Sequence, residues 1–400
     1  MSVKLNDVGK KIAIAGAGPA GSSLAIRLAR EGFDVTLIER EVFPRQKLCG
    51  EFISPECLEH FADLGVLDAI AAAGGDSVHE TAFYSAAGRS VTVPSTYLGH
   101  GDALSLSRAE MDNRMMQTAR SAGVRVIEDA CAGEVLFTAS GAVCGVRIRR
   151  SDAATETIGA DVLVDATGRS AAIARLLAKT GARSTKPVAK PSFVGFKTHL
   201  RNTRIEPGRC EIYFFRGGYG GLTNIEGGLA NLCFLVRSSV VRHLRSDAGE
   251  VVRRVVMSNK RASETLDGAE PAHDWTAVPL GNYGRKELNP ALGVFCVGDA
   301  AAFIDPFTGS GMLLALESAQ ILSAAITAET ENPARIAAAY SDAHKRMFSS
   351  RLLTASMLRR AAFIPLLADS VIRAASASNA LTEMLARFTR RRAISAISRR

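Results

Sequence analysis

The stretch Lys11–Arg40, KIAIAGAGPAGSSLAIRLAREGFDVTLIER, decides the fold of this chain. An apolar, β-type run, Ile12–Ala15, leads into the glycine pattern Gly16, Gly18 and Gly21. A helical pattern follows the glycines, and a second apolar run ends at Glu39. This order of strand, glycine turn, helix and strand predicts a βαβ unit with a dinucleotide-binding site at its first turn.

Each glycine of the motif has a separate physical role. Gly16 permits the tight turn, Gly18 lets the backbone approach a pyrophosphate, and Gly21 lets the helix pack closely on the strand. The phosphates would bind free N–H groups at the start of the helix, beside Pro19 and Ala20. An acid at the end of the second strand accepts from the adenosine ribose hydroxyls, so Glu39, followed by Arg40, completes the predicted site. The motif alone does not separate FAD from NAD.

Length and composition indicate a globular protein of two interlocked domains, with 400 residues and 47% apolar content. The first ten residues lack the apolar core of a secretion signal, and no run of about 18 uncharged apolar residues occurs. The seven cysteines contain no CxxC pair, and the histidines show no HxxxH spacing. The sequence therefore predicts a cytoplasmic protein in a reducing compartment, without a metal site and without a membrane span.

The basic charge of the chain is concentrated at its end. Residues 343–400 carry twelve Lys and Arg against Asp369 and Glu383, whereas the net charge of the whole chain is +9. Stacking aromatics are not interleaved with these cations, which argues against a nucleic-acid partner. The basic helices are either a solvated cap or a peripheral contact with an anionic membrane or an acidic carrier protein. The oligomeric state stays open.

The periodicity changes along the chain and predicts an α/β fold with an α+β substrate domain. Strand and helix patterns assign a discontinuous Rossmann-like nucleotide-binding domain to residues 1–77, 101–185 and 286–330. Alternating β-type runs with glycine turns predict an inserted antiparallel-sheet substrate domain at 78–100 and 186–285. Residues 331–400 read as a C-terminal helical region.

Two further glycine junctions follow buried strands. The first, VDATGRS, contains Asp165 and Gly168, and the second, GDAAAFIDPFTGSGM, begins at Gly298 and Asp299. Asp299 offers a carboxylate to sugar-alcohol hydroxyls. The later part of the second junction brings backbone N–H groups and a helix N-terminus together, at Pro306, Gly309, Ser310, Gly311 and Met312. A helix N-terminus favours negative charge, such as that of a reduced flavin.

Two other positions have both a functional and a structural interpretation. The loop Pro44–Gly50 follows the second strand and is expected at the carboxyl edge of the sheet, where ligands bind in open α/β folds. Cys49 and Gly50 are therefore candidate site residues, although Cys49 is equally explained as a small apolar residue in a turn. Arg108 begins a helix and is either a solvated residue or a phosphate clamp.

Five motifs in this order resemble one family. GAGPAG with a later ER, FPRQKLCG, SRAEMDNRM, VDATGRSAAIAR and GDAAAFIDPFTGSGM are similar to those of the FAD-dependent geranylgeranyl-reductase-like flavoproteins. These belong to the p-hydroxybenzoate hydroxylase fold superfamily, with aromatic hydroxylases and flavin halogenases. The resemblance covers about residues 11–330. It implies an FAD-dependent oxidoreductase that uses NADPH or NADH as electron donor.

The resemblance also implies positions for the cofactor. The adenosine lies at Gly16–Gly21 and Glu39, Arg108 lies near the pyrophosphate or ribitol, and Asp299 binds the ribitol. Asp165 and Gly168 form the junction that serves FAD and the nicotinamide donor. The catalytic end lies beneath the isoalloxazine at Pro306, Gly309 and Gly311, with Cys49 and Gly50 in the facing loop.

Departures from the family patterns narrow the predicted reaction. Prenyl reductases carry an aromatic-Trp-Phe-Pro type stretch where this chain reads YGGLTNIEGG, with Gly221 at the tryptophan position. Halogenases carry a WxWxIP stretch and a relay lysine, whereas the single Trp275 lies outside such a motif and no lysine occurs between Lys47 and Lys179.

The leading prediction is a monooxygenase that hydroxylates an apolar, aromatic or polyketide/isoprenoid-like small molecule. The alternative is a flavin-dependent reductase of C=C bonds, with Cys49 near the reacting carbon. Halogenation, or modification of a carrier-bound or protein-bound substrate, is less favoured.

Overall fold

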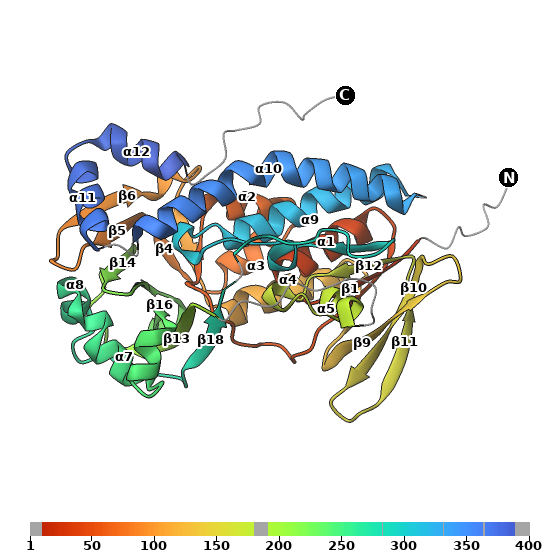
Figure 1. Ribbon diagram of the computed structural model, residues 1–400, viewed down its shortest axis with the longest axis horizontal. Coiled ribbons are helices and arrows are strands. Elements are labelled where there is room, and N and C mark those ends of the chain that lie inside the picture. Colours follow the sequence, from red (N-terminus) through yellow and green to blue (C-terminus); the bar gives the residue numbers. More distant parts are fainter. Residues whose placement is uncertain (1–9, 180–190, 282, 331, 363–364, 389–400) are drawn as a thin grey trace.

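The computed structural model describes residues 10–179, 191–281, 283–330, 332–362 and 365–388. A parallel sheet with its helices, a mixed sheet with a second set of helices, and a group of C-terminal helices make up these residues (Figure 1). The predicted α/β fold class is thereby confirmed. The arginines at 390–392 lie outside the described residues.

The opening βαβ unit forms the centre of a five-stranded parallel sheet. Its strand order is β20-β12-β1-β2-β8, with bounds β1 Lys11–Ala15, β2 Asp34–Ile38, β8 Arg125–Ile127, β12 Val162–Asp165 and β20 Val294–Cys296. Side chains alternate along β1 because successive Cβ atoms point to opposite faces. Ile12 and Ile14 join one core cluster, and Ala13 and Ala15 join the cluster on the other face.

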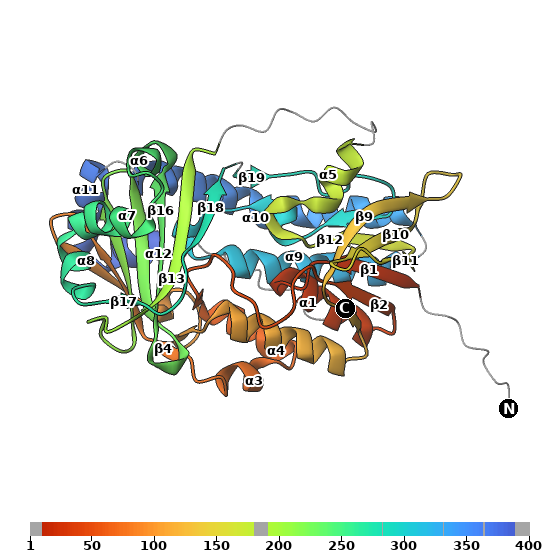
Figure 2. The same ribbon diagram turned by 90° about the horizontal axis from the view of Figure 1, so that it is seen from below.

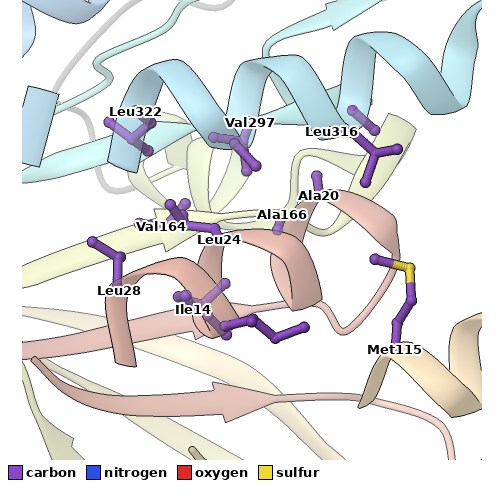
Figure 3. Packing of buried hydrophobic residues seen from close by; sticks show 14 of the residues in the cluster. Ile14, Ala20, Leu24, Leu28, Met115, Val164, Ala166, Val297, Leu316 and Leu322 are labelled. Carbon is purple, nitrogen blue, oxygen red and sulfur yellow. The ribbon is translucent and has the colours of Figure 1, made fainter. Parts of the chain in front are cut away.

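Three helices cover the first face of the parallel sheet: α1 (Pro19–Arg30), α4 (Arg108–Ser121) and α9 (Gly311–Ala328). Figure 3 shows Leu24 and Leu28 of α1 among buried residues of the sheet and of α9, such as Val164 and Leu316. The second face is covered by α5 (Ala172–Lys179) and by a meander of β9 (Ala130–Phe137), β10 (Val143–Arg150) and β11 (Thr155–Gly159). Apolar side chains on both faces fix the carboxyl edge of the sheet as a rigid platform.

Among the described residues, α9 is the one helix that is long and apolar enough to cross a membrane by length and composition. Two-thirds of its hydrophobic window, 67%, is buried within the protein. This burial indicates that α9 is a core helix of the fold. Its interior Glu317 forms an ion pair with Arg351 of the following helix.

The substrate sheet contains eight strands and is not purely antiparallel. It is built from β5 (Glu80–Tyr84), β6 (Ser90–Pro94), β13 (Phe193–Arg201), β14 (Arg209–Phe215), β15 (Gly218–Asn224), β16 (Ala230–Arg237), β17 (Glu270–Pro271) and β18 (Thr276–Leu280). The predicted hairpin β5–β6 is present, but β5 pairs in parallel with β14. The expectation of an antiparallel sheet is corrected at this pair, because the hairpin enters from a distant segment and docks beside a strand of the same direction.

Helices cover one face of the substrate sheet: α6 (Ser238–His243), α7 (Ala248–Arg254) and α8 (Lys260–Thr265). Tyr213 and Phe215 of β14 pack toward this helical layer, whereas Phe214 belongs to a cluster on the opposite face. Short elements join the two domains: β3 (Phe52–Ile53), β4 (Asp76–Val78), β7 (Ala103–Ser105), α2 (Pro55–Asp63), α3 (Leu67–Ala71), β19 (Gly284–Arg285) and β21 (Ala302–Phe303). The exact domain limits given above remain predictions.

The last described elements are α10 (Pro333–Ala362), α11 (Pro365–Ser376) and α12 (Asn379–Phe388). Helix α10 runs along α9, and α11 and α12 lie over β5 and β6 at the other end of the molecule (Figure 1). In the view from below, the substrate sheet and the parallel sheet lie at opposite ends, with α9 and α10 spanning between them (Figure 2). Helices α11 and α12 therefore belong to the substrate half of the fold, whereas α10 packs on α9 of the nucleotide-binding half.

Candidate functional site

A single continuous cavity of about 680 Å³ connects the carboxyl edge of the parallel sheet with the substrate sheet. Most of the predicted site residues line it: Gly16, Gly18, Pro19, Ala20, Glu39, Arg40, Cys49, Gly50, Arg108, Gly168, Gly298, Asp299, Pro306, Gly309, Gly311 and Met312. Gly21, Asp165 and Ser310 are not among the lining residues. The fold thus brings three glycine junctions, far apart in sequence, to one place.

The glycine motif is shaped as the sequence requires. Gly16 has a φ of +104°, and a Cβ there would lie 2.4 Å from the carbonyl oxygen of Ala166. A Cβ on Gly21 would lie 1.8 Å from the Gly16 oxygen, which explains its role in packing rather than in lining the cavity. At Gly18 the nearest atoms would be 3.9 Å away, so its missing side chain leaves room for a ligand. No side chain caps the first turn of α1, and its N–H groups remain available for phosphate.

The Glu39 carboxylate is fixed at the end of β2, in the wall of the cavity. Its Oε2 accepts a hydrogen bond from the backbone N–H of Ala17 at 2.8 Å, and its Oε1 accepts from that of Glu41 at 3.1 Å. This places an oriented acid beside the glycine turn, as a ribose ligand requires. Arg40 is exposed and pairs with Glu41, at the outer edge of the site.

Arg108 is buried and ion-paired, so the alternative of a solvated residue is wrong and the phosphate clamp stays a prediction. Its Nε and Nη2 donate to the two carboxylate oxygens of the buried Asp112 at 2.8 and 2.7 Å. Arg45 donates to the same carboxylate at 2.8 Å. Both guanidinium groups reach within 3.9 Å of the Cβ position at Gly18. Burial opposes the charge of Arg108, but the Asp112 carboxylate outweighs it and raises the pKa, so the clamp stays cationic.

Lys47 adds a third cation to this part of the wall. Burial lowers the pKa of Lys47, and the neighbouring charges of Arg108 and Arg45 lower it further. An anionic ligand beside these groups would relieve the repulsion between them. A pyrophosphate is such a ligand.

The second junction assigns different roles to Asp165 and Gly168. Asp165 is fully buried, and its carboxylate accepts from the backbone N–H groups of Thr167 at 3.0 Å and Ala174 at 3.1 Å. The prediction that Asp165 binds the cofactor directly is therefore corrected, because its oxygens are used to hold the turn and the start of α5. Gly168, with a φ of +70°, lines the cavity in its place.

Asp299 lines the cavity, and within the described part of the chain no hydrogen bond reaches its carboxylate. Burial raises the pKa of Asp299, although Arg169 and Lys286 lie close enough to oppose that shift. Lys286 donates to the backbone oxygen of Asp299 at 2.8 Å. The side chain remains available to a ligand hydroxyl, as the ribitol assignment requires.

The third junction presents a second helix N-terminus to the cavity. The short turn Pro306–Thr308 leads into α9, whose first turn has no side-chain cap. Gly309, Gly311 and Met312 line the cavity, whereas Ser310 is fully buried and lies behind them. The prediction for Ser310 is corrected accordingly. The positive end of the α9 dipole thus faces the cavity, where it stabilises negative charge on a bound group.

Asp305 and Tyr219 connect this junction to the substrate sheet. The Tyr219 hydroxyl donates to Oδ1 of the buried Asp305 at 2.8 Å, and burial beside that carboxylate raises the tyrosine pKa well above its ordinary value. Phe307, two residues after Asp305, packs edge-on against the Tyr219 ring, with the ring centroids 5.3 Å apart. A domain contact is thereby formed at the end of the cavity where the flavin ring is expected.

Cys49 lies in the cavity wall beside a buried ionic cluster that sequence reasoning missed. The Cys49 sulfur accepts from the backbone N–H of Glu51 at 3.3 Å, and Glu51 has a strained φ of 57°. The Glu51 carboxylate accepts from Lys197 Nζ at 2.5 Å and from the backbone N–H of Arg108 at 2.8 Å, and it bonds His199 Nε2 at 2.8 Å. We refer to Glu51, Lys197 and His199 as the Glu51 cluster.

The ionised form of Glu51 is stabilised by its two partners in the Glu51 cluster. Burial would raise the pKa of Glu51, but the His199 hydrogen bond and the Lys197 charge outweigh burial and lower the pKa. Its sequence signal was the run FKTHL, in which Lys197 and His199 are two residues apart and share one face of β13. The spacing identifies a common face, but only the docking of the two domains places that face against the Cys49 loop.

The substrate half of the cavity is apolar and aromatic. Seven aromatic rings line the cavity: Phe52, Phe83, Phe214, Tyr219, Phe234, Phe303 and Phe307. Gly221 also lines the cavity. Among the described residues, no group of three or more His, Cys, Asp and Glu is arranged to hold a metal ion.

FAD fits the residues present. The space left by Gly18, the two helix N-termini without side-chain caps and the clamp of Arg45 and Arg108 match a long dianionic dinucleotide. These features define the class as a dinucleotide-binding protein whose site fits FAD. FAD supplies the hydride and electron chemistry when bound, and the protein supplies binding, orientation and water exclusion.

The comparisons place the chain in a family. The sequence profile of the FAD binding domain family matches residues 10–350, and the chain belongs to this family. It is 30% identical over 319 residues to digeranylgeranylglycerophospholipid reductase 2 of Methanopyrus kandleri, covering 78% of this chain and 75% of the relative. It is 27% identical to a tryptophan 2-halogenase of Chondromyces crocatus, covering 79% of this chain and 60% of the relative.

The relatives differ in length. The chain spans 62% of the conditioned medium factor receptor 1 of Dictyostelium discoideum, to which it is 27% identical over 79% of its own length. Geranylgeranyl-reductase-like and halogenase proteins thus both occur among the relatives, and the resemblance to the geranylgeranyl-reductase-like flavoproteins is confirmed.

Solved structures show the same fold. A geranylgeranyl bacteriochlorophyll reductase-like protein of Thermoplasma acidophilum superposes with a TM-score of 0.77, at 19% identity and 94% and 96% coverage of the two chains. The flavin-dependent brominase Bmp2 gives 0.74 at 18% identity, with 94% and 92% coverage. A probable FAD-dependent monooxygenase, pqsL of Pseudomonas aeruginosa, gives 0.71 at 19% identity, with 90% and 99% coverage. The chain therefore shares its fold with these flavoenzymes and belongs to the FAD binding domain family.

Proposed function

We propose that the protein is an NAD(P)H-dependent FAD monooxygenase that hydroxylates an apolar, aromatic or polyketide/isoprenoid-like molecule. The observation that carries this proposal is the composition of the substrate half of the cavity. Its described wall consists mainly of aliphatic and aromatic side chains, threonines and cysteines. The charged lining groups nearest to it are Glu51, which is paired with Lys197 and His199, and Arg169, which lies over the Phe303 ring. Oxygen transfer from a flavin requires a dry, shaped pocket. It does not depend on a side-chain acid or base at the substrate, because the cofactor carries the reaction.

The polar groups of that wall are not poised for proton transfer. Burial raises the pKa values of Cys210 and Cys233 to about 12, and both thiols stay neutral. Tyr219 donates to Asp305, which orients its ring and ties the flavin loop to the sheet. These residues shape the pocket and exclude water. The N-terminus of α9 then favours the reduced, anionic form of the cofactor.

A second candidate function is the reduction of an activated C=C bond. Cys49 favours it, because this thiol lies in the cavity wall next to the cations of the FAD clamp. A double-bond reduction needs a proton donor as well as a hydride, and Cys49 is positioned to be one. The relatives that act as reductases, including a menaquinone reductase of Mycolicibacterium smegmatis at 24% identity, agree with this alternative.

Anaerobic turnover separates the two functions. With NADPH and a converted substrate, a monooxygenase stops when oxygen is removed, whereas a reductase continues. The candidate substrates are first screened by stopped flow for acceleration of flavin reduction. Product formation that persists without oxygen contradicts the monooxygenase proposal.

The Cys49→Ala variant provides an independent test. We expect hydroxylation to be retained within about threefold, because no thiol acts in that reaction. A reductase that uses Cys49 as proton donor would lose 10²-fold or more, the usual contribution of a general acid. Normal flavin absorbance of the variant is the control for cofactor binding.

A further inference from the structure

We infer that the end of the cavity beneath the C-terminal helices binds an extended apolar chain of the substrate. This tail lobe is formed by Val91, Val93, Leu98, Val371, Ile372, Ala375, Thr382 and Ala386. The inference rests on the proposed function for the opposite end, where the reacting part of the substrate faces the flavin. It names the substrate class as an amphipathic molecule with an alkyl, acyl or polyprenyl tail.

The arrangement of elements makes the lobe a continuation of the flavin pocket. Helix α11 packs on β6 and β14, and α12 packs on β6 and on the turn Ser95–Tyr97. Ile372 of α11 joins the cluster of Phe214, Tyr219 and Phe303, with Phe307 packed against it. The wall therefore runs without interruption from the flavin loop to the C-terminal helices.

The lobe offers no polar group to a ligand among its described residues. Seven of the eight side chains are hydrocarbon. The exception, Thr382, is 6% exposed, and its hydroxyl donates to the backbone oxygens of Ala375 at 2.8 Å and Ser378 at 3.2 Å. A chain of methylene or isoprene units matches this surface, because it gains burial without leaving a polar atom unpaired.

Two alanines keep the lobe wide enough for a chain. Ala375 and Ala386 are 4% and 8% exposed and are the smallest side chains of the lobe wall. Val371 lines the same lobe and is 44% exposed, so the lobe reaches the surface at α11. Asp369, two residues before Val371, forms an ion pair with Arg89 at 2.5 Å and holds α11 on the β5–β6 hairpin. The helices thus act as a wall whose small residues leave room for a chain.

The test is a chain-length series bound to the FAD-loaded enzyme. Two series of probes are titrated, 4-alkylphenols and n-alkanols with two to ten carbons, and binding is read from the visible spectrum of the bound flavin. We expect the Kd to fall about fourfold for each added CH₂, the value for full burial of a methylene, until the lobe is filled. A Kd that is independent of chain length in both series overturns the inference.

Substitutions in the wall locate the binding site. In Ala375→Phe and Ala386→Phe, we expect the plateau to occur at a chain several carbons shorter. Ala374→Phe is the matched control, because Ala374 is on the same helix but exposed to solvent. It should leave the series unchanged. If a phenylalanine variant fails to retain flavin, the leucine variant at the same position is used. An unshifted plateau in folded variants at both Ala375 and Ala386 also overturns the inference.

The outcome is separable from that of the proposed function. If the substrate is hydroxylated but the Kd does not depend on the chain length of the probes, the tail-lobe inference is rejected and the proposed monooxygenase function is kept. If the Kd depends on the chain length but turnover continues without oxygen, the tail-lobe inference is kept and the proposed monooxygenase function is rejected.

Discussion

At the scale of single residues, the cofactor site depends on the missing side chain of Gly18. Gly18 has room around its Cα, and the guanidinium groups of Arg45 and Arg108 approach that space. The helix N-terminus and the two cations therefore converge where a pyrophosphate would lie. A side chain here would remove the space without disturbing the fold.

We predict that Gly18→Val reduces the FAD content of the purified protein by more than tenfold. The isopropyl group would occupy the path of the phosphates. The measurement is the ratio of flavin absorbance to protein absorbance. Gly159→Val in β11 is the control, because a Cβ there meets no atom within 4 Å and the strand accepts a β-branched residue. Equal flavin content in both variants would refute the assignment of the glycine turn.

Glu51 connects the two domains through one carboxylate. We predict that Glu51→Gln increases the rate of Cys49 alkylation by about tenfold. The amide weakens the bonds to Lys197 and His199, so the strained backbone that donates to the Cys49 sulfur relaxes. Lys197 also loses its counter-charge next to the thiol loop. The measurement is peptide-resolved mass spectrometry after iodoacetamide treatment.

A second buried glutamate supplies the matched control for Glu51. Glu211 is also fully buried and accepts from Arg261, Tyr213 and Thr265, on the helical side of the substrate sheet. Glu211→Gln should cost comparable stability and leave the Cys49 rate unchanged. Equal rates in the two variants would show that the Glu51 cluster does not position the Cys49 loop.

At the scale of elements, two helices bring their N-termini to the cavity because apolar packing holds them. Helix α9 is buried between α1 and α10, and α10 in turn carries the fully buried His344. The His344 ring packs edge-on between Tyr340 and Phe348, with centroids 5.8 and 4.6 Å away. We expect this buried histidine to make the stability of the helical layer depend on pH.

We predict a loss of stability as the pH falls from 6.5 to 4. Burial, with the nearby Arg285, lowers the pKa of His344 to about 4 in the folded protein. The unfolded chain takes up this proton near pH 6.5, so protonation favours unfolding. The stabilisation is complete above pH 6.5 and decreases by at most about 3 kcal/mol by pH 4.

The variant His344→Phe should remove this part of the pH dependence, since phenylalanine keeps the ring packing. Urea denaturation at pH 7.0 and 4.5 measures the difference. His243→Phe, at an exposed position, is the control and should keep the wild-type dependence. The same slope in all three proteins would contradict the assignment.

At the scale of the whole molecule, the C-terminal helices divide into two parts. Residues up to Ala386 supply part of the cavity wall. Residues 389–400 include Arg390, Arg391, Arg392, Arg399 and Arg400 and no acid. The two parts can be tested separately, because deletion after residue 388 leaves every described lining residue in place.

We predict that deletion of residues 389–400 lowers binding to vesicles of phosphatidylserine and phosphatidylcholine by at least tenfold. Each basic residue near an anionic surface contributes about 1 kcal/mol. Vesicle co-sedimentation measures binding, and flavin content and turnover should stay unchanged. Neutral phosphatidylcholine vesicles are the control. Undiminished binding of the truncated protein would remove the membrane from the proposed partners, and an acidic carrier protein would be tested next.

The cofactor end of the site was largely predictable from local sequence. The roles of Gly16, Gly18 and Gly21 follow from the backbone geometry of one turn, although the backbone that crowds Gly16 belongs to the distant residue Ala166. Asp165 and Ser310 show where this reasoning fails. Both belong to matching motifs, but the direction of a side chain at a strand end or helix start depends on which backbone amides are already paired.

The sequence by itself determined the βαβ unit and the three glycine junctions, because these depend on short-range spacing and on steric limits of the backbone. The FAD-binding class followed from the resemblance of five ordered motifs to a known family. The tertiary structure alone decided that Lys197 and His199 meet Glu51, that Tyr219 meets Asp305, and that the C-terminal helices enclose the substrate cavity. These contacts join residues more than 80 positions apart. Periodicity specifies which residues share a face, whereas the burial of apolar surface between domains decides which faces meet.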